Sequence, residues 1–386
     1  MKMQKMDDIK YMKKALRLAE LGRGHTSPNP MVGCVIVKDG KIIGHGYHRC
    51  YGEKHAEAAA IDNASESVEG ATLYCNLEPC CHTIPGKKTP PCAQRIIKEK
   101  IGRVVIATKD PNPYVNGKGI EVLRKHGIQV ETGILSEEAA LLNERYFKYI
   151  QTRMPFVHLK IAQSLDGRIA TSNGNSRWIT NQTARKIVHQ MRATYDAVLV
   201  GANTVVKDNP SLTVREVEGR NPYRVVLDDK LIIPDDAMLI SDEWRDRTII
   251  FTALEQDHPR VMELQTREIQ VITTQKNESG HLDLQPVLKR LAELNIASVL
   301  VEGGAEVFTS FIKNKIFDKI SLFIAPIIIG SGVDSVGNLG IRSLSEALRL
   351  EKVRIKTIDD QVLIEGYRDF HTLFKNRGED KKCLPD

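Results

Sequence analysis

The stretch that decides the fold of the N-terminal part reads His55-Ala-Glu57, Leu77-Glu-Pro-Cys-Cys-His82 and Lys88-Thr-Pro-Pro-Cys92. One imidazole and two thiolates form the ligand set of catalytic zinc sites, which keep a fourth position for water. We therefore expect His55, Cys80 and Cys92 to bind one zinc ion (Zn2+). The surrounding pattern predicts a helix at residues 55–64, a strand at 72–76 and a helix at about 91–100.

Glu57 follows His55 by two residues on the opening turn of that helix. Zinc lowers the pKa of a bound water near to neutrality, and a carboxylate beside the metal can carry protons to a departing amine. His-x-Glu followed by Pro-Cys and a second cysteine is typical of zinc deaminases of nucleobases, although Cys80 and Cys92 are twelve positions apart instead of three. The alternative is a closed structural zinc site with Cys81 or His82 as the fourth ligand.

Working outward, the first part of the chain alternates strands and helices. Residues 7–21 have a helical apolar face, and two strands at 31–37 and 41–46 flank a hairpin turn at Asp39-Gly40. Buried strands are expected at 104–108 and 129–132, with a helix at 119–126 between them. The pattern predicts an α/β sandwich, and a helix at 136–151 ends before Met154-Pro155. We place the domains at 1–150 and 151–370, followed by a polar tail at 371–386.

The second part also alternates short apolar strands with helices. Strands are expected at 156–162, 197–200, 223–227, 248–251, 269–272 and 298–301, with helices at 182–193, 284–294 and 305–313. The order predicts a mostly parallel sheet with helices on its faces, closed by a strand-rich segment from 318 onward. At 299–305 a strand is expected to run through Gly303-Gly304 into a helix. Backbone N–H groups at such a helix N-terminus can bind a phosphate, but the same pattern is also common in plain tight connections.

Composition excludes several classes of protein. A chain of 386 residues with 41% hydrophobic and 27% charged residues is typical of a soluble two-domain protein. No apolar run approaches the roughly 20 residues of a membrane span, and the start has no secretory signal, so a cytoplasmic enzyme is expected. The net charge of +6 is dispersed, which favours anionic small molecules over nucleic acid. Seven cysteines, six of them within the first 92 residues, favour metal ligation over disulfides.

Further motifs carry a resemblance to a known family. They are Ser27-Pro-Asn-Pro-Met-Val-Gly33, Asp110-Pro-Asn-Pro113, Lys160-Ile-Ala-Gln-Ser-Leu-Asp-Gly-Arg-Ile-Ala170, Ser176-Arg-Trp-Ile-Thr180, Val200-Gly-Ala-Asn-Thr-Val205, Asp208-Asn-Pro-Ser-Leu-Thr-Val-Arg215 and Glu302-Gly-Gly304. With the motifs quoted first, they resemble the bacterial riboflavin biosynthesis deaminase–reductases, in family order and up to about Arg368. The resemblance implies a cytidine-deaminase-like three-layer α/β/α domain followed by a dihydrofolate-reductase-like α/β domain.

The resemblance also implies roles for residues of the first domain. His55, Cys80 and Cys92 bind zinc, and Glu57 is the acid and base. The pyrimidine or its phosphate is contacted by Asn29, His82 and Lys88. The loop between the two cysteines is about three residues longer than the family pattern, an extension that costs little because closure entropy grows slowly with length.

In the second domain the resemblance implies a nicotinamide pocket and a ribotide pocket. The pocket for NADPH is formed by Ala162, Trp178, Thr204, Asp208 and Gly304. The ribotide is lined by Ser176, Arg192, Leu212, Arg215 and Glu302. Lys160 and Asp208 assist protonation as hydride reaches the sugar carbon. Two structural alternatives to a functional role stay open: Asp166-Gly167 could form only a turn, and Trp178 could be a core residue.

Taken together, these features predict a bifunctional enzyme that deaminates a phosphorylated pyrimidine ribotide and then reduces its ribosyl chain with NADPH. Its expected partner is this small molecule, not nucleic acid or a membrane, and a homo-oligomer (dimer or tetramer) is left open. Three rivals remain: a nucleic-acid or nucleotide zinc deaminase with an accessory α/β domain, a non-catalytic zinc scaffold, and a fusion with one lost activity. Cys34, Cys50, Cys75, His126 and His189 are interpreted as packing or surface residues.

Overall fold

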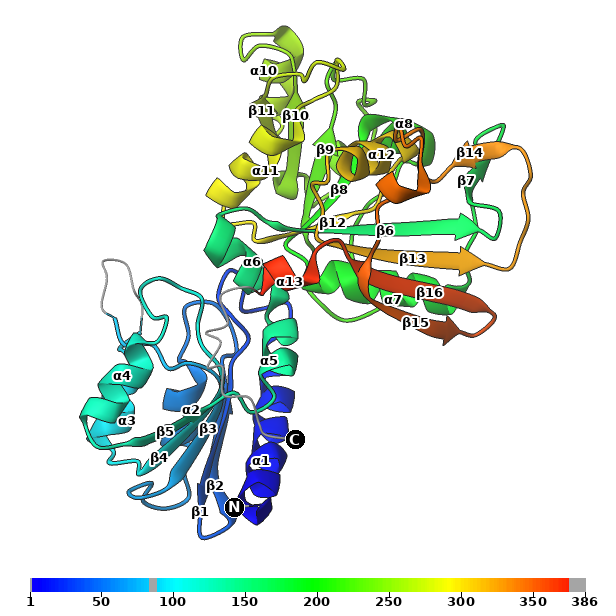
Figure 1. Ribbon diagram of the computed structural model, residues 1–386. Coiled ribbons are helices and arrows are strands. Elements are labelled where there is room, and N and C mark those ends of the chain that lie inside the picture. Colours follow the sequence, from blue (N-terminus) through cyan, green and yellow to red (C-terminus); the bar gives the residue numbers. More distant parts are fainter. Residues whose placement is uncertain (1, 83–88, 375–386) are drawn as a thin grey trace. The chain divides into compact units, whose positions relative to one another are not determined.

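The computed structural model describes residues 2–82 and 89–374 (Figure 1). The chain forms two compact units, Arg153–Phe370 and a first unit that joins Met1–Thr152 to the segment beginning at His371. Lys88, residues 84–87 of the longer loop and most of the polar tail lie outside the described residues. Every helix in the described ranges is too short or too polar to cross a membrane.

The first unit is built on a five-stranded sheet in the order β2-β1-β3-β4-β5. Its strands are β1 (Gly33–Lys38), β2 (Lys41–Tyr47), β3 (Thr72–Leu77), β4 (Arg103–Thr108) and β5 (Gln129–Thr132). β1 runs antiparallel to β2 and β3, whereas β3, β4 and β5 are parallel. Every residue of β4 is buried, as expected for a parallel strand covered on both faces.

Helices cover both faces of this sheet (Figure 1). They are α1 (Lys2–Glu20), α2 (Ala56–Asp62), α3 (Cys92–Lys98), α4 (Lys118–Lys125), α5 (Ser136–Leu142) and α6 (Glu144–Thr152). α1 and α5 lie on one face, and α2, α3 and α4 lie on the other. α1 approaches β1 so closely that a Cβ at Gly33 would come within 2.1 Å of the Ala15 carbonyl oxygen. The expected three-layer α/β/α domain is confirmed.

The predicted single helix at 136–151 is wrong in one respect, because it is broken at Asn143 between α5 and α6. The Asn143 side chain accepts a hydrogen bond from the Met31 amide (2.7 Å) and donates one to the Met31 carbonyl (2.9 Å). This pairing mimics a backbone contact across 112 positions of sequence, so a helical pattern alone could not reveal it.

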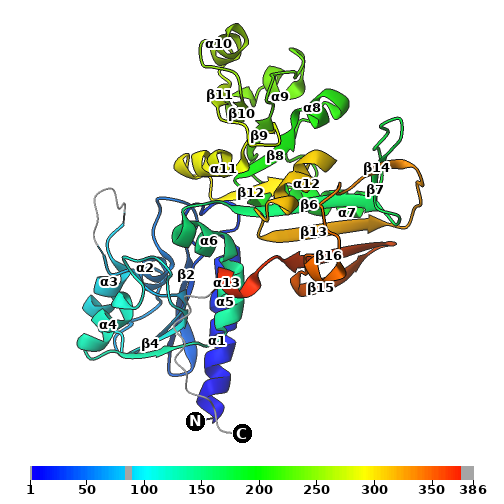
Figure 2. The ribbon, with the colours of Figure 1, turned by 45° about the horizontal axis from the view of Figure 1, so that its top comes forward.

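The second unit contains a nine-stranded sheet in the order β11-β10-β9-β8-β12-β6-β13-β16-β15. Its strands are β6 (Phe156–Ser164), β8 (Ala197–Gly201), β9 (Tyr223–Leu227), β10 (Thr248–Thr252), β11 (Gln270–Thr273), β12 (Ser298–Val301), β13 (Lys319–Ala325), β15 (Glu351–Ile358) and β16 (Gln361–Tyr367). Neighbours from β11 to β13 are parallel, and β16 pairs antiparallel with β13 and β15. The predicted mostly parallel sheet is confirmed (Figure 2). A separate ribbon pairs β7 (Arg168–Thr171) with β14 (Gly332–Asp334).

Two groups of helices bury the faces of this larger sheet. The helices are α7 (Gln182–Thr194), α8 (Ala202–Asp208), α9 (Met238–Ser241), α10 (Pro259–Thr266), α11 (Leu284–Glu293) and α12 (Ala305–Lys313), whereas α13 (Phe370–Leu373) lies almost wholly in the segment that belongs to the first unit. The main core packs apolar side chains of α11 and α12 against β6, β8, β9, β10 and β12. A second cluster packs Ala184 and Val188 of α7 against Phe323 and Leu363 on the other face. The central strands are therefore covered on both faces, whereas most of the edge strand β15 is exposed.

Candidate functional site

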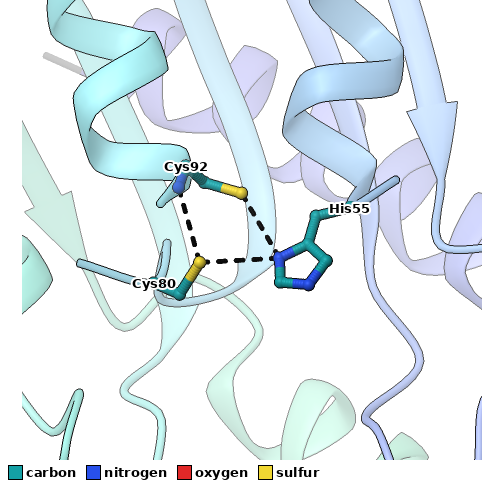
Figure 3. Close-up of side chains that lie close together, drawn as sticks. All are labelled: His55, Cys80 and Cys92. Carbon is teal, nitrogen blue, oxygen red and sulfur yellow. Dashed lines mark hydrogen bonds between the residues drawn. The ribbon is translucent and has the colours of Figure 1, made fainter. Parts of the chain in front are cut away.

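The first candidate site joins His55, Cys80 and Cys92 at the ends of three different elements (Figure 3). His55 is the residue before α2, Cys80 follows β3, and Cys92 opens α3. The His55 Nδ1 atom lies 3.5 Å from Cys80 Sγ and 3.4 Å from Cys92 Sγ. The Thr89 hydroxyl lies 3.0 Å from His55 Nε2, which leaves Nδ1 facing the two sulfur atoms.

This geometry fits a zinc ion. Tetrahedral coordination with ordinary Zn–N and Zn–S bonds places nitrogen and sulfur ligands about 3.6 Å apart. The measured separations agree with that edge length, and all three ligand atoms lie within 4.8 Å of one another. In the described part of the chain, neither Cys81 nor His82 contributes an atom to this group. Three protein ligands with a fourth position available are the arrangement of a catalytic site.

The two thiols differ in pKa: the hydrogen bond with Cys80 and burial raise the pKa of Cys92, whereas the pKa of Cys80 is lowered. The Cys92 thiol hydrogen-bonds Cys80, and together with the His55 ring it lowers the pKa of Cys80 to about 3. The Cys92 backbone N–H also donates to Cys80 Sγ at 3.4 Å. A thiolate is the ligand form of cysteine, so Cys80 is already in the required state at neutral pH.

Glu57 lies beside this group on the first turn of α2 and is only 3% exposed. Burial raises the pKa of its carboxyl group, against the opposing effect of the His55 ring. The same carboxyl group hydrogen-bonds the Cys92 thiol. A carboxyl group with a raised pKa, next to a metal position but outside the ligand set, is suited to receiving and returning a proton.

The predicted pyrimidine contacts lie around this group to different extents. The Asn29 amide nitrogen is 3.4 Å from His48 Nε2, and the His48 ring centre is 5.4 Å from that of His55. The half-buried His82 ring lies 5.9 Å from the Tyr114 ring, centre to centre. Asn29 is therefore linked to the metal group through His48, which sequence reasoning did not single out.

Glu78, inside the Leu-Glu-Pro-Cys motif, is a second residue without an assigned role. Its Oε2 atom accepts the backbone N–H groups of Asp110 (3.3 Å) and Gly117 (2.9 Å). Its Oε1 atom accepts those of Gly119 (3.0 Å) and Ile120 (3.2 Å). The segment held in this way also carries Val115, which packs against Cys80 and Cys92. Glu78 thus anchors the Asp-Pro-Asn-Pro segment against the metal group.

The second candidate site is a cavity of about 520 Å³ in the second unit. It collects most of the predicted reductase residues: Lys160, Ala162, Ser176, Trp178, Arg192, Thr204, Asp208, Arg215, Glu302 and Gly304. Lys160 and Ala162 belong to β6, Thr204 and Asp208 to α8, and Gly304 precedes α12. Leu212 is outside this set; its side chain is 2% exposed and does not line the cavity.

A buried ion network forms one wall of the cavity. Arg192 donates to both carboxylate oxygens of Glu302, at 2.6 and 2.9 Å, and Lys160 Nζ lies 3.4 Å from Glu302 Oε2. Burial alone would raise the pKa of Glu302, but Arg192 and Lys160 outweigh it and lower the pKa to about 2. The carboxylate therefore remains ionised and holds both cations in place.

Asp208, Trp178 and the glycine turn also line the cavity. The Ser176 hydroxyl donates to Asp208 Oδ1 at 3.2 Å, and the Arg177 side chain donates to the Asp208 carbonyl. Trp178 is 68% exposed with the Arg185 guanidinium 4.5 Å from its ring centre, so it is not a core residue. Gly304 has φ +81°, a conformation that other residues adopt only with strain, where the chain enters α12.

Comparison with known proteins identifies both halves. Residues 5–108 match the cytidine and deoxycytidylate deaminase zinc-binding region, and residues 155–364 match the RibD C-terminal domain. The riboflavin biosynthesis protein RibD of Aquifex aeolicus is 46% identical over 358 residues, covering 92% of this chain and 97% of the relative. The chain belongs to the RibD family.

Solved structures agree over nearly the whole length. Acinetobacter baumannii RibD (form 1) has a TM-score of 0.84 at 34% identity, covering 94% of this chain and 99% of that one. A diaminohydroxyphosphoribosylaminopyrimidine deaminase/5-amino-6-(5-phosphoribosylamino)uracil reductase from Thermotoga maritima has a TM-score of 0.82 at 40% identity, with the same coverage. The expected order of the two domains in this RibD family member is confirmed.

Two further interpretations from sequence can now be placed. Asp166-Gly167 does form a turn, with Gly167 at φ +83°, and the Asp166 carboxylate accepts the backbone N–H groups of Ile329 and Gly330. His189 is 5% exposed, which agrees with its interpretation as a packing residue, and it also lines the reductase cavity. Its spacing of three residues before Arg192 on one helix was the available signal.

Proposed function

We propose that this RibD family member catalyses two consecutive steps of riboflavin biosynthesis. The first unit hydrolytically deaminates 2,5-diamino-6-(5-phosphoribosylamino)pyrimidin-4-one with zinc. The second unit reduces the ribosyl chain of the product with NADPH, giving 5-amino-6-(5-phosphoribitylamino)uracil. The observation that carries the proposal is the His55, Cys80 and Cys92 group beside the buried Glu57, in a chain with a separate cation-lined cavity.

For deamination, His55, Cys80 and Cys92 would hold the metal. Zinc, when bound, would lower the pKa of a water so that hydroxide is available near neutral pH to attack the amino-bearing carbon. Glu57 takes the proton released by the water and returns it to the departing amine, and its raised pKa suits both transfers. Asn29, His82 and Lys88 would contact the pyrimidine or its phosphate.

For reduction, the ribotide would lie against Ser176, Arg192, Arg215 and Glu302. Arg215 offers a fork of donors to the phosphate. Leu212, also expected to line the ribotide, is buried and does not line the cavity, so it would act through the backbone of its segment.

The cofactor would lie against the other part of the cavity. Ala162, Trp178, Thr204, Asp208 and Gly304 form its pocket. NADPH supplies the hydride, and the protein holds the two reactants in register. Lys160 and Asp208 would assist proton transfer to the opening sugar oxygen, and the ion pair with Glu302 holds Lys160 in position.

The direct test is to incubate the purified protein with the diaminopyrimidine ribotide, with and without NADPH, and to analyse the products by mass spectrometry. Without NADPH we expect exchange of one amino group for oxygen and release of ammonia. With NADPH we expect the further addition of two hydrogens. Recovery of unchanged ribotide from a zinc-loaded, folded protein would contradict the proposal.

A further inference from the structure

The cavity of the second unit contains a buried histidine that the proposed reaction does not yet use. His189 lies on α7, one turn before Arg192, and lines the cavity. Its Nδ1 atom is 3.2 Å from the backbone nitrogen of Arg215, which donates the hydrogen bond. The ring therefore joins α7 to the segment that carries the predicted phosphate-binding arginine.

This hydrogen bond determines where the proton of the ring lies. A nitrogen that accepts an N–H cannot carry a proton, so the neutral ring is protonated on Nε2. Burial and the guanidinium groups of Arg192 and Arg215 lower the pKa of His189 to about 4, so the ring is neutral at physiological pH. Among the described residues, the Arg215 amide is the hydrogen-bond partner of this side chain, and Nε2–H is left for a ligand.

Two guanidinium groups and two carboxylates act on the ring, those of Arg192, Arg215, Glu216 and Glu302. Arg192 is already paired with Glu302 and also donates to the Thr213 carbonyl at 3.2 Å. Arg215 is exposed, and its side chain contacts only hydroxyl groups among the described residues, those of Ser211 and Thr213. Glu216 also lines the cavity and is the acidic neighbour of this group. Of the two arginines beside the ring, Arg215 is the one whose hydrogen bonds in the described residues go to hydroxyl groups and not to a carboxylate, although Glu216 and Glu302 act on it through space.

We propose that His189 is a substrate-binding residue of the reductase, whose Nε2–H donates to a phosphate oxygen of the ribotide while Nδ1 holds the Arg215 amide. A neutral donor adds a directed hydrogen bond to the charge of Arg215 without introducing a group that titrates near neutral pH. This inference rests on the proposed reductase function and deepens it, because it assigns a second residue to the phosphate end of the substrate.

Two substitutions distinguish the roles of the two ring nitrogens. His189→Asn keeps an acceptor near the position of Nδ1 and removes the donor at Nε2. His189→Gln keeps a donor near Nε2 and removes the acceptor for Arg215. If the donor binds phosphate, His189→Asn raises the KM for the deaminated ribotide and the inhibition constant of inorganic phosphate by about tenfold or more, with little change in kcat. His189→Gln stays within about threefold of the unsubstituted protein, since one hydrogen bond to an uncharged backbone group is worth little.

His258→Asn is a matched control, because His258 Nδ1 also accepts a backbone N–H at 3.2 Å, from Arg260, but is exposed and outside the cavity. His258→Asn should leave unchanged both the KM for the deaminated ribotide and the inhibition constant of inorganic phosphate. The inference is overturned if His189→Asn behaves like the unsubstituted protein, or if His189→Gln is impaired as much as His189→Asn. If either variant fails to fold, the ring 15N shifts of His189 in the unsubstituted protein decide, because phosphate must shift Nε2 and leave Nδ1 unprotonated.

The failure of this inference differs from failure of the proposed function. An unsubstituted protein that does not reduce the deaminated ribotide with NADPH contradicts the proposed function itself. If the unsubstituted protein does reduce the deaminated ribotide, but inorganic phosphate inhibits His189→Asn and His189→Gln with the same inhibition constant, only the role of His189 is contradicted.

Discussion

Arg192 and Glu302 form a two-pronged ion pair inside the reductase cavity, with nitrogen–oxygen distances of 2.6 and 2.9 Å. The Glu302 side chain is 5% exposed and that of Arg192 12%. A charge at this depth is tolerated only while its partner is present. The pair therefore connects the stability of the second unit to the electrostatics of its candidate active site.

Glu302→Gln should destabilise the second unit by about 3 kcal/mol, because Arg192 and Lys160 lose their buried counter-charge. Chemical denaturation at pH 7, followed by a probe in the second unit, measures the loss. Glu306→Gln, also at the cavity but not ion-paired among the described residues, is the control. Equal stability of the Glu302 and Glu306 variants would show that the ion pair contributes nothing net.

The same pair predicts a pH dependence. The pKa of Glu302 is about 2 in the folded protein and about 4.3 in an unfolded chain, so ionisation favours folding above pH 4.3. Its contribution is fully present near pH 6 and declines as the pH falls toward 2. The stability difference between the unsubstituted protein and Glu302→Gln should therefore shrink between pH 5 and pH 3. A difference that grows in acid would have the wrong sign.

Glu57→Gln should lower deamination by about 10²- to 10⁴-fold, because the amide cannot carry the proton. Zinc content and reduction of pre-deaminated ribotide should remain unchanged, since the ligands and the second unit are untouched. Ammonia release, metal analysis and NADPH oxidation measure the three quantities. Glu66→Gln, an exposed residue of the same unit, is the control. Loss of NADPH oxidation in folded Glu57→Gln would overturn the assignment of one reaction to each unit.

Lys160→Ala should give the opposite pattern, with ammonia release intact and NADPH oxidation reduced by about 10²-fold or more. Lys186→Ala, on the exposed side of α7, serves for comparison. Because Lys160 also neutralises Glu302, the melting temperature of the second unit must be recorded with the kinetics. Normal NADPH oxidation by Lys160→Ala would remove Lys160 from the reaction.

Glu78→Gln should weaken the first unit by at least about 2 kcal/mol, because an amide NH2 replaces one oxygen that accepts two buried N–H groups. Deamination should fall with it, since Val115 and the segment around it lose their anchor beside the zinc cysteines. Denaturation and ammonia release test this, with Glu99→Gln as the control because Glu99 pairs only with a partly exposed arginine among the described residues. Unchanged stability would show that other contacts hold the segment.

The sequence by itself determined the local features of both sites. His55, Cys80 and Cys92 could be proposed as ligands because their chemical types and the neighbouring Glu57 are informative without coordinates. The apolar run of β4 and the glycine turn before α12 likewise predicted their elements, since burial on both faces and φ > 0 constrain residue type directly.

Contacts between distant parts of the chain were decided only by the tertiary structure. Asn143 breaks a regular helical pattern by pairing with Met31, and Glu78 gathers four N–H groups from a segment more than thirty positions away. His189 acquires a role only when Arg215 is folded against it, and Leu212 is buried away from the cavity that Asp208 and Arg215 line. Periodicity and motif report on neighbours in sequence, whereas a hydrogen bond depends on positions in space that the whole fold sets.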